Sequence, residues 1–173
     1  DEEPGLVKTL RGRSLSRLSD GTIAMTYNAP GDGFLIRWSK DDGHSWSDPT
    51  LGGRLGTVPV SNHIVEIADG DLLVTTRASI AKTPVHKCVM QYRSKDRGQS
   101  WDGPEVIATD PTLNLTEPST VRLIDTRLMC VMRENSYNCF PCYRIFSEDD
   151  GQSWSELQPM PLFGHELYLG QLL

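Results

Sequence analysis

The sequence Ser-Lys-Asp-Asp-Gly-His-Ser-Trp at residues 39–46 returns twice, as the pattern Ser-x-Asp-x-Gly-x-Ser-Trp, at residues 94–101 and 147–154. The copies start 55 and then 53 residues apart. Five shared positions in eight, at a near-constant period, indicate a repeat protein whose unit is one supersecondary module. The repeat therefore decides the fold class before any other feature is considered.

Each octapeptide is expected to form the turn of a β-hairpin. Its aspartate, such as Asp41, can accept backbone N–H bonds within the turn, and its glycine, such as Gly43, supplies a positive φ. The closing tryptophan, such as Trp46, is expected to fold beneath the turn as an apolar anchor. The equivalent residues of the other copies are Asp96, Gly98 and Trp101, and Asp149, Gly151 and Trp154.

The segments upstream of the octapeptides also repeat, as a short strand, a turn, a second strand, a variable loop and a third strand. The second strands are predicted at 22–27, 71–77 and 127–133, and the third strands at 34–38, 88–93 and 143–146. A fourth strand follows each tryptophan, and no helix is expected. Four short antiparallel strands per unit predict an all-β fold, a β-propeller of four-stranded blades.

The blades are predicted at residues 10–58, 59–112 and 113–161, with the start of a fourth at 162–173, within one partial propeller domain spanning 1–173. Propellers usually close with roughly 4–8 blades. We therefore expect about three blades of a six-bladed ring. Either the chain is a fragment, which the sequence favours, or two copies form a homodimer that completes the ring.

The composition narrows the class of protein. With 38% hydrophobic residues and no long apolar run, the sequence predicts a soluble globular chain without a membrane-inserted segment. Its net charge of −6 argues against nucleic acid as a general partner, although an acidic ligand suits a locally basic site. A lone C-x-x-C at 139–142, without a second pair or a histidine cluster, predicts no metal and no cofactor.

The octapeptides resemble the Asp-box of the sialidase (neuraminidase) superfamily, a likeness that extends from about Arg11 to the last residue. The resemblance implies an exo-sialidase, a retaining glycoside hydrolase that releases terminal sialic acid, and it favours a secreted or periplasmic location. A sialylated or other acidic glycan would be the partner. Asp-boxes also occur in propellers with other functions, so the site must be sought in other residues.

The third blade contains the most specific candidates, Glu117 and Arg133, which a hairpin of neighbouring strands would place side by side at the central channel. In the family, such a glutamate supports a tyrosine nucleophile, and such an arginine belongs to a triad that binds the substrate carboxylate. A planar guanidinium binds a carboxylate bidentately. A neutral tyrosine is not repelled by that carboxylate, which is why sialidases depart from the two-carboxylate scheme of other glycosidases. A plain ion pair lining the channel is the alternative.

The first two blades supply further candidates. Arg11 lies where the family places its first triad arginine, but the local sequence lacks the usual aromatic residue and proline, so Arg13 competes. Asp32 lies where sialidases keep their general acid, with a plain turn aspartate as the alternative. Arg77 has the same blade position as Arg133 and can line the same channel. His63, on an inner strand, is expected to be a satisfied polar residue of the channel wall.

In the family, the nucleophile and the third arginine lie in later blades. The chain alone is therefore not expected to hydrolyse sialosides unless self-association supplies these groups. Two other readings stay open. One is a lyase or hydrolase for uronate-containing polysaccharides, and the other is a non-catalytic glycan-binding propeller.

Overall fold

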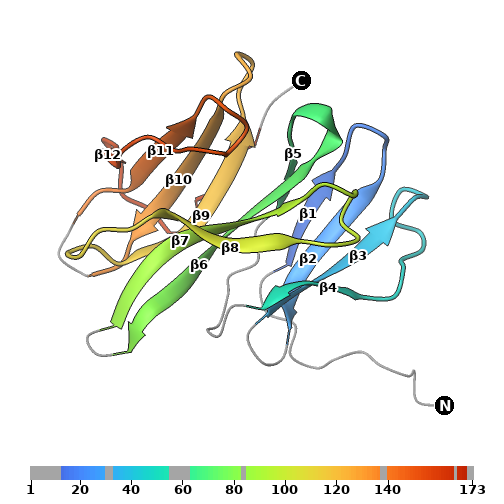
Figure 1. The fold of residues 1–173 in the computed structure, drawn as a ribbon, viewed down its shortest axis with the longest axis horizontal. Helices are drawn as coiled ribbons and strands as arrows, with labels where there is room; N and C mark the ends of the chain where they lie inside the picture. Colours follow the sequence, from blue (N-terminus) through green and yellow to red (C-terminus); the bar gives the residue numbers. More distant parts are fainter. Residues whose placement is uncertain are drawn as a thin grey trace.

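The computed structural model describes residues 13–29, 33–54, 63–82, 85–136, 140–165 and 167–170. These form three four-stranded antiparallel sheets that lie side by side (Figure 1). The first contains β1 (Arg13–Arg17), β2 (Ile23–Ala29), β3 (Gly33–Ser39) and β4 (Thr50–Arg54). The second contains β5 (Ile64–Glu66), β6 (Leu72–Lys82), β7 (Val85–Ser94) and β8 (Asp102–Ala108). The third contains β9 (Leu115–Arg122), β10 (Leu128–Glu134), β11 (Tyr143–Ser147) and β12 (Gln158–Pro159).

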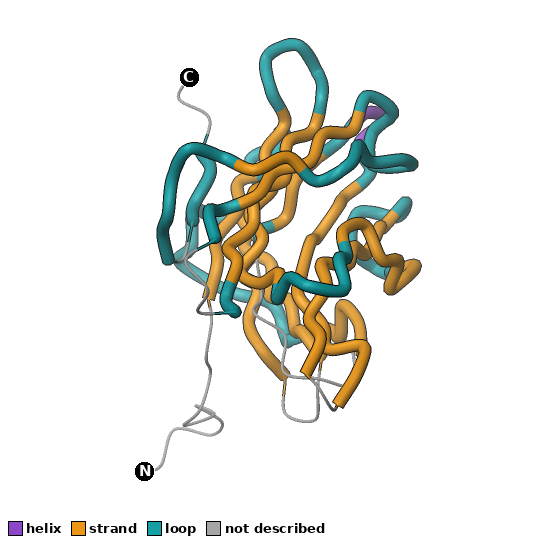
Figure 2. Tube along the Cα trace, turned by 90° about the vertical axis from the view of Figure 1, so that its left-hand side faces the viewer, coloured by secondary structure: helices purple, strands orange, loops and turns teal. Residues whose placement is uncertain are grey.

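Within each sheet the strands follow one another in chain order, as in a propeller blade. The prediction of an all-β fold built from four-stranded blades is confirmed. A single 3-10 turn, Ala68–Gly70, lies among the loops at one end of the sheets (Figure 2). In the part of the chain that the structure describes, no helix has the length and apolarity needed to cross a bilayer.

The hairpin of β6 and β7 is longer than the sequence indicated. The predicted second strand stopped at residue 77 and the predicted third strand began at residue 88, with a variable loop between them. In the structure the ladder continues through the pairs Ala78–Cys88 and Ser79–Lys87, past a bulge between Ser79 and Ala81. Backbone pairing therefore turns part of the expected loop into strand, and it places Lys87 within the sheet.

The three Asp-box turns, residues 39–46, 94–101 and 147–154, share one hydrogen-bond pattern. In the first, Asp41 Oδ1 accepts the Ser39 hydroxyl at 2.8 Å and the Ser45 backbone N–H at 2.9 Å. The Ser45 hydroxyl also donates to Asp41 Oδ2, at 2.5 Å. The same contacts recur at Asp96 with Ser94 and Ser100, and at Asp149 with Ser147 and Ser153.

These hydrogen bonds stabilise the charged form of each aspartate. Led by the hydroxyl and N–H of the second serine, they lower the pKa of Asp41, Asp96 and Asp149 from 3.8 to about 2. The box glycines have the predicted positive φ, between 80° and 88°. The residue before each glycine is also left-handed, with φ of 55°, 59° and 55° at Asp42, Arg97 and Asp150. Each box is therefore a rigid turn stabilised by its own polar side chains.

The apolar core lies largely between neighbouring blades. One cluster joins residues of the first and second blades, including Phe34, Ile36, Leu72 and Tyr92, and a second joins the second and third blades through Val89, Leu115, Cys130 and Met132. Trp101 packs against the first cluster and Trp154 against the second, as expected of box anchors. Trp46 instead donates its indole N–H to Gly43 O of its own turn, at 3.1 Å. Packing between blades thus sets the relative positions of residues far apart in the sequence.

Candidate functional site

The two ends of the blades carry different residues. One end holds the Asp-box turns and the turns after β1, β5 and β9, and we call it the box end. Glu117, at the start of β9, and Arg133, at the end of β10, lie at the opposite end, which we call the loop end. Because β9 and β10 are antiparallel, the hairpin brings these two residues together, as the sequence predicted.

Glu117 and Arg133 form a partly buried ion pair. Arg133 Nη1 donates to Glu117 Oε1 at 2.9 Å, and the two side chains are 11% (Arg133) and 19% (Glu117) exposed. The other terminal nitrogen, Nη2, donates to Asn135 Oδ1 at 2.7 Å. The guanidinium is thus held on both sides while remaining accessible to a ligand.

The backbone at Glu117 is strained. Its φ of 49° lies in the left-handed region, which costs a non-glycine residue of order 1–3 kcal/mol, and Pro118 follows it directly. The register between β9 and β10 shifts between Val131 and Arg133, beside this residue. An irregularity of this kind can re-aim a side chain, and here Glu117 meets Arg133. Such strain concentrates at functional sites.

Two cations of the second blade lie beside this pair. Arg77 Nη1 lies 3.4 Å from Thr116 Oγ1, next to Glu117, and the buried Arg77 Nε has no hydrogen-bond partner among the described residues. Lys87 lies near the same groups, because its pKa is lowered first by burial and then by the charges of Arg77 and Arg133, while Glu117 raises it. Among the described residues, Arg77, Lys87 and Arg133 thus lie near the Glu117 carboxylate, a local grouping of positive charge that suits an anionic ligand.

Lys87 is absent from the residues that the sequence singled out. The alternation of side chains along β7 could have identified it. A period of two puts Lys87 on the same side as Val89, a buried residue of the core between the second and third blades. Arg77 pairs directly with Val89 across the sheet, so both cations face the third blade. The sequence did not indicate this position, because the third strand of the blade was predicted to begin at residue 88 and Lys87 was expected in the loop before it.

The two other predicted site residues, Arg11 and Asp32, lie outside the described residues. Arg13 is the first residue of β1, but its side chain is not among those that the structure describes. His63 contacts Thr120 O through Nε2 and lies with its ring 5.5 Å from that of Tyr168. Burial lowers the His63 pKa. This arrangement fits the predicted polar residue of the channel wall.

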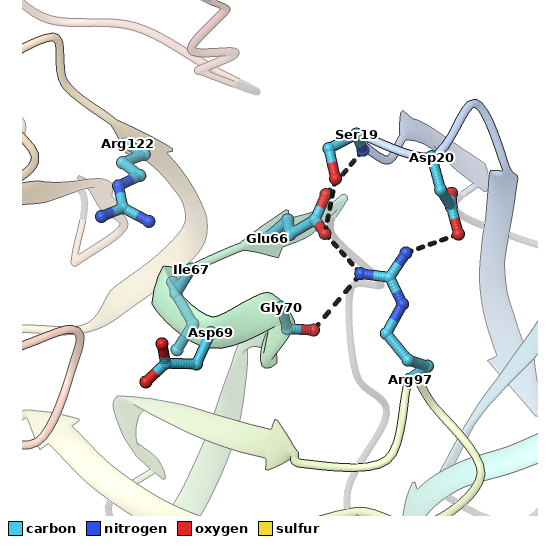
Figure 3. Close-up of a pocket in the computed structure, with 8 residues that line it drawn as sticks. All are labelled: Ser19, Asp20, Glu66, Ile67, Asp69, Gly70, Arg97 and Arg122. Carbon is cyan, nitrogen blue, oxygen red and sulfur yellow. Dashed lines mark hydrogen bonds and ion pairs between the residues drawn. The ribbon is translucent and has the colours of Figure 1, made fainter.

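The box end contains a pocket of about 680 Å³, in which Arg97 binds two of the acidic residues that line it (Figure 3). Arg97, in the second Asp-box turn, pairs with Glu66 and with Asp20, the latter at 2.7 Å. Ser19 also donates its backbone N–H and its hydroxyl to Glu66, at 2.6 and 2.9 Å. Arg122 lies across the pocket in Figure 3 and pairs with Asp150 at 3.7 Å. Because the contacts of Arg97 join the first and second blades, we assign this network to stability rather than to ligand binding.

The described residues include no group of three or more histidine, cysteine, aspartate or glutamate side chains that could hold a metal. Cys88, Cys130 and Cys142 are free thiols, all buried. Cys139, the other member of the C-x-x-C, lies outside the described residues.

The blades, the Asp-box turns and the site at the loop end define the class of protein, a β-propeller built from Asp-box repeats. The model of the BNR repeat-like domain matches residues 20–164, and the chain belongs to this family. None of the curated proteins compared with the chain by sequence matches it.

Three solved structures illustrate the fold. A protein of unknown function from Dyadobacter fermentans has a TM-score of 0.78 and 18% identity, with 90% of this chain and 52% of that one covered. An α-L-arabinanase from Penicillium chrysogenum, complexed with arabinobiose, has a TM-score of 0.68 and 18% identity over 89% and 50%. The Hadza microbial sialidase Hz136 has a TM-score of 0.68 and 17% identity over 86% and 37%. The chain thus spans about half the length of these proteins, or less.

Proposed function

We propose that this chain forms part of a propeller that binds and processes acidic glycans, with release of terminal sialic acid as its specific activity. The observation that carries the proposal is that Arg77, Lys87 and Arg133 lie, among the described residues, near the carboxylate of Glu117. The likeness to a sialidase and to an arabinanase supports a glycan as the substrate class. The excess of cations favours an acidic glycan over a neutral one.

The substrate carboxylate would bind Arg133. Its guanidinium is already oriented by Glu117 and Asn135, so a ligand loses little side-chain entropy when it binds there. Arg77 brings a second guanidinium from the neighbouring blade, and the buried Nε of Arg77 lacks a partner that a ligand or water would supply. In this assignment Arg11 is a further carboxylate ligand.

The chemical step would follow the scheme that the family resemblance implies. Asp32 donates a proton to the leaving-group oxygen, while a neutral tyrosine attacks the anomeric carbon and passes its proton to Glu117. Arg133 orients the Glu117 carboxylate through their hydrogen bond. The tyrosine and the third arginine would come either from a longer polypeptide that contains these residues or from a second copy of the chain.

A second candidate is a uronate-containing polysaccharide, processed by a lyase or a hydrolase. The same observation supports it, because Arg77, Lys87 and Arg133 would bind a uronate carboxylate equally well. The two candidates differ in the sugar that presents the carboxylate, so a comparison of ligands separates them.

The first test is calorimetric titration of the chain with N-acetylneuraminic acid, its methyl ester and glucuronic acid. We expect the acid to bind, the uncharged ester to bind at least 10-fold more weakly, and Arg133→Ala to weaken the acid about 10- to 100-fold. Arg17→Ala, an exposed arginine paired with Asp42 at the box end, is the matched control and should change nothing. Preference for glucuronic acid would favour the second candidate, and equal binding of acid and ester would refute both.

The second test addresses turnover in the complete propeller that contains these residues. Glu117→Ala and Arg133→Ala should each lower kcat/KM for a fluorogenic sialoside by at least about 100-fold. Normal turnover in both variants would refute the proposed roles, even if the acid binds.

A further inference from the structure

A second cavity opens at the loop end beside Arg133. It has a volume of about 280 Å³, and its walls come from the end of β10, the loop before β11 and the segment after β12. The lining residues are Arg133, Glu134, Asn135, Phe140, Cys142, Phe163, Gly164 and His165. Because Arg133 also belongs to the cationic cluster, this cavity adjoins the proposed carboxylate site at that residue.

Backbone hydrogen bonds hold the walls in place. The Cys142 N–H donates to Leu162 O at 2.9 Å, and the Met160 N–H donates to Cys142 O at 2.8 Å, which fixes the segment before Phe163 against the start of β11. These bonds fix one wall of the cavity.

The acidic residue in the wall is already bound. Glu134 Oε1 accepts the backbone N–H of Asn114 and of Ser136, each at 2.9 Å, and Oε2 accepts the Ser136 hydroxyl at 2.9 Å. Because these bonds use both oxygens of the Glu134 carboxylate, this side chain stabilises the wall of the cavity. Arg133, Asn135 and His165 are the other polar groups that line the cavity.

Two phenylalanines with exposed rings flank this cavity. Phe163 is 69% exposed and Phe140 is 41% exposed. Exposed large apolar side chains beside convergent polar groups are typical of a ligand site. A pyranose ring fits this combination, because its C–H face packs on an aromatic ring while its hydroxyls reach polar side chains.

We propose that this cavity is a subsite for one neutral sugar ring, the ring that neighbours the acidic sugar in the glycan. The inference rests on the proposed function, since Arg133 would hold the carboxylate of the acidic sugar at the edge of the cavity. Pockets for drug-sized ligands occupy about 300–1,000 Å³. A cavity of about 280 Å³ therefore suits a single ring rather than an oligosaccharide. Phe163 and Phe140 would contact the apolar face of that ring.

The experiment compares 3′-sialyllactose, which carries a neutral neighbour, with free N-acetylneuraminic acid and with lactose, by calorimetry on the chain. Phe163→Ala should weaken 3′-sialyllactose about three- to ten-fold and leave free N-acetylneuraminic acid within about two-fold. Phe163→Tyr keeps the aromatic ring and should retain the affinity. Ile124→Ala, which removes an exposed apolar side chain at the box end, is the matched control.

The outcomes separate the subsite from the proposed function. If Phe163→Ala and Phe140→Ala leave 3′-sialyllactose unchanged while Arg133→Ala weakens both acidic probes, the subsite is refuted and the acidic-glycan function stands. Equal weakening of both acidic probes by Phe163→Ala would also refute the assignment to a second ring. If lactose binds in a Phe163-dependent way and neither acid binds, the neutral-sugar subsite stands and the acidic-glycan function is refuted.

Discussion

The box end and the loop end are built from the same charged residue types but use them differently. At the box end, Arg97 binds Asp20 and Glu66, and each box aspartate is enclosed by serines of its own turn. At the loop end, Arg77, Lys87 and Arg133 lie near one another among the described residues, and Arg133 pairs with Glu117. Paired charges stabilise contacts between blades, whereas an excess of one sign attracts a ligand. The difference indicates that changes at the box end affect stability and changes at the loop end affect binding.

The largest expected effect is on stability, at Gly98 of the second Asp-box turn. Its φ is +87°, and an added Cβ would lie 2.3 Å from Cζ2 of Trp38 in the first blade. Gly98→Ala should lower the free energy of unfolding by about 2–4 kcal/mol, through the left-handed backbone and the overpacking together. Urea denaturation measures this change.

Gly21→Ala is the matched control for that variant. Gly21 has the same φ of +87°, but an added Cβ there would meet nothing within 4 Å. It should cost only the backbone part, about 1–2 kcal/mol. Equal destabilisation by the two variants would show that the contact with Trp38 contributes nothing. Altered affinity for N-acetylneuraminic acid in folded Gly98→Ala would contradict the separation of the two ends.

The second expected effect is on binding, at Lys87. Removing one charge from a partly exposed cluster is worth about 1 kcal/mol, so Lys87→Met should weaken N-acetylneuraminic acid about five-fold. Burial and the neighbouring guanidinium groups lower the Lys87 pKa, so its charge is lost at a pH below the ordinary range of lysine.

Titrations across the alkaline range test this assignment. Affinity of the unmodified chain should fall as the pH rises through the lowered Lys87 pKa, and Lys87→Arg should remove that fall because arginine stays charged. A pH profile that is the same in both proteins would contradict the role of Lys87. Stability should change little, since the hydrogen bond of Arg133 to Glu117 does not involve this side chain.

The smallest expected effect is the stability that each single Asp-box turn loses when its aspartate is protonated at acidic pH. The pKa of Asp149 is about 2 in the folded protein, below its ordinary value of 3.8. The stabilisation is therefore fully present above about pH 4 and is lost as the pH falls toward 2. Unfolding free energies measured between pH 5 and pH 2 should decline, and Asp149→Asn should reduce the slope. An unaltered slope in Asp149→Asn would contradict this account.

The sequence predicted the features that depend on local chemistry. The box pattern contains the serines that hold each aspartate and the glycine that supplies the turn, so the fold class followed from three octapeptides. Glu117 and Arg133 were also predictable as neighbours, because a hairpin with a short turn places the start of one strand beside the end of the next.

Other features depend on where strands end and how blades pack. The left-handed backbone of Glu117 and the register shift beside it arise from the pairing of β9 with β10, and no residue type marks them in advance. Lys87 lies beside Arg133 because the β6–β7 ladder continues past residue 88 and its face packs on the third blade. Its position thus depends on the length of this ladder and on packing between the second and third blades.

The sequence by itself determined the repeat, the turn chemistry and the pairing of Glu117 with Arg133, because each depends on interactions within one blade. Only the tertiary structure decided which cations gather near Glu117, that a cavity flanked by Phe140 and Phe163 lies beside Arg133, and that Arg97 at the box end pairs with Asp20 and Glu66. The physical reason is that these arrangements depend on packing between blades and between segments distant in the chain, where buried apolar contacts rather than local preferences set the positions.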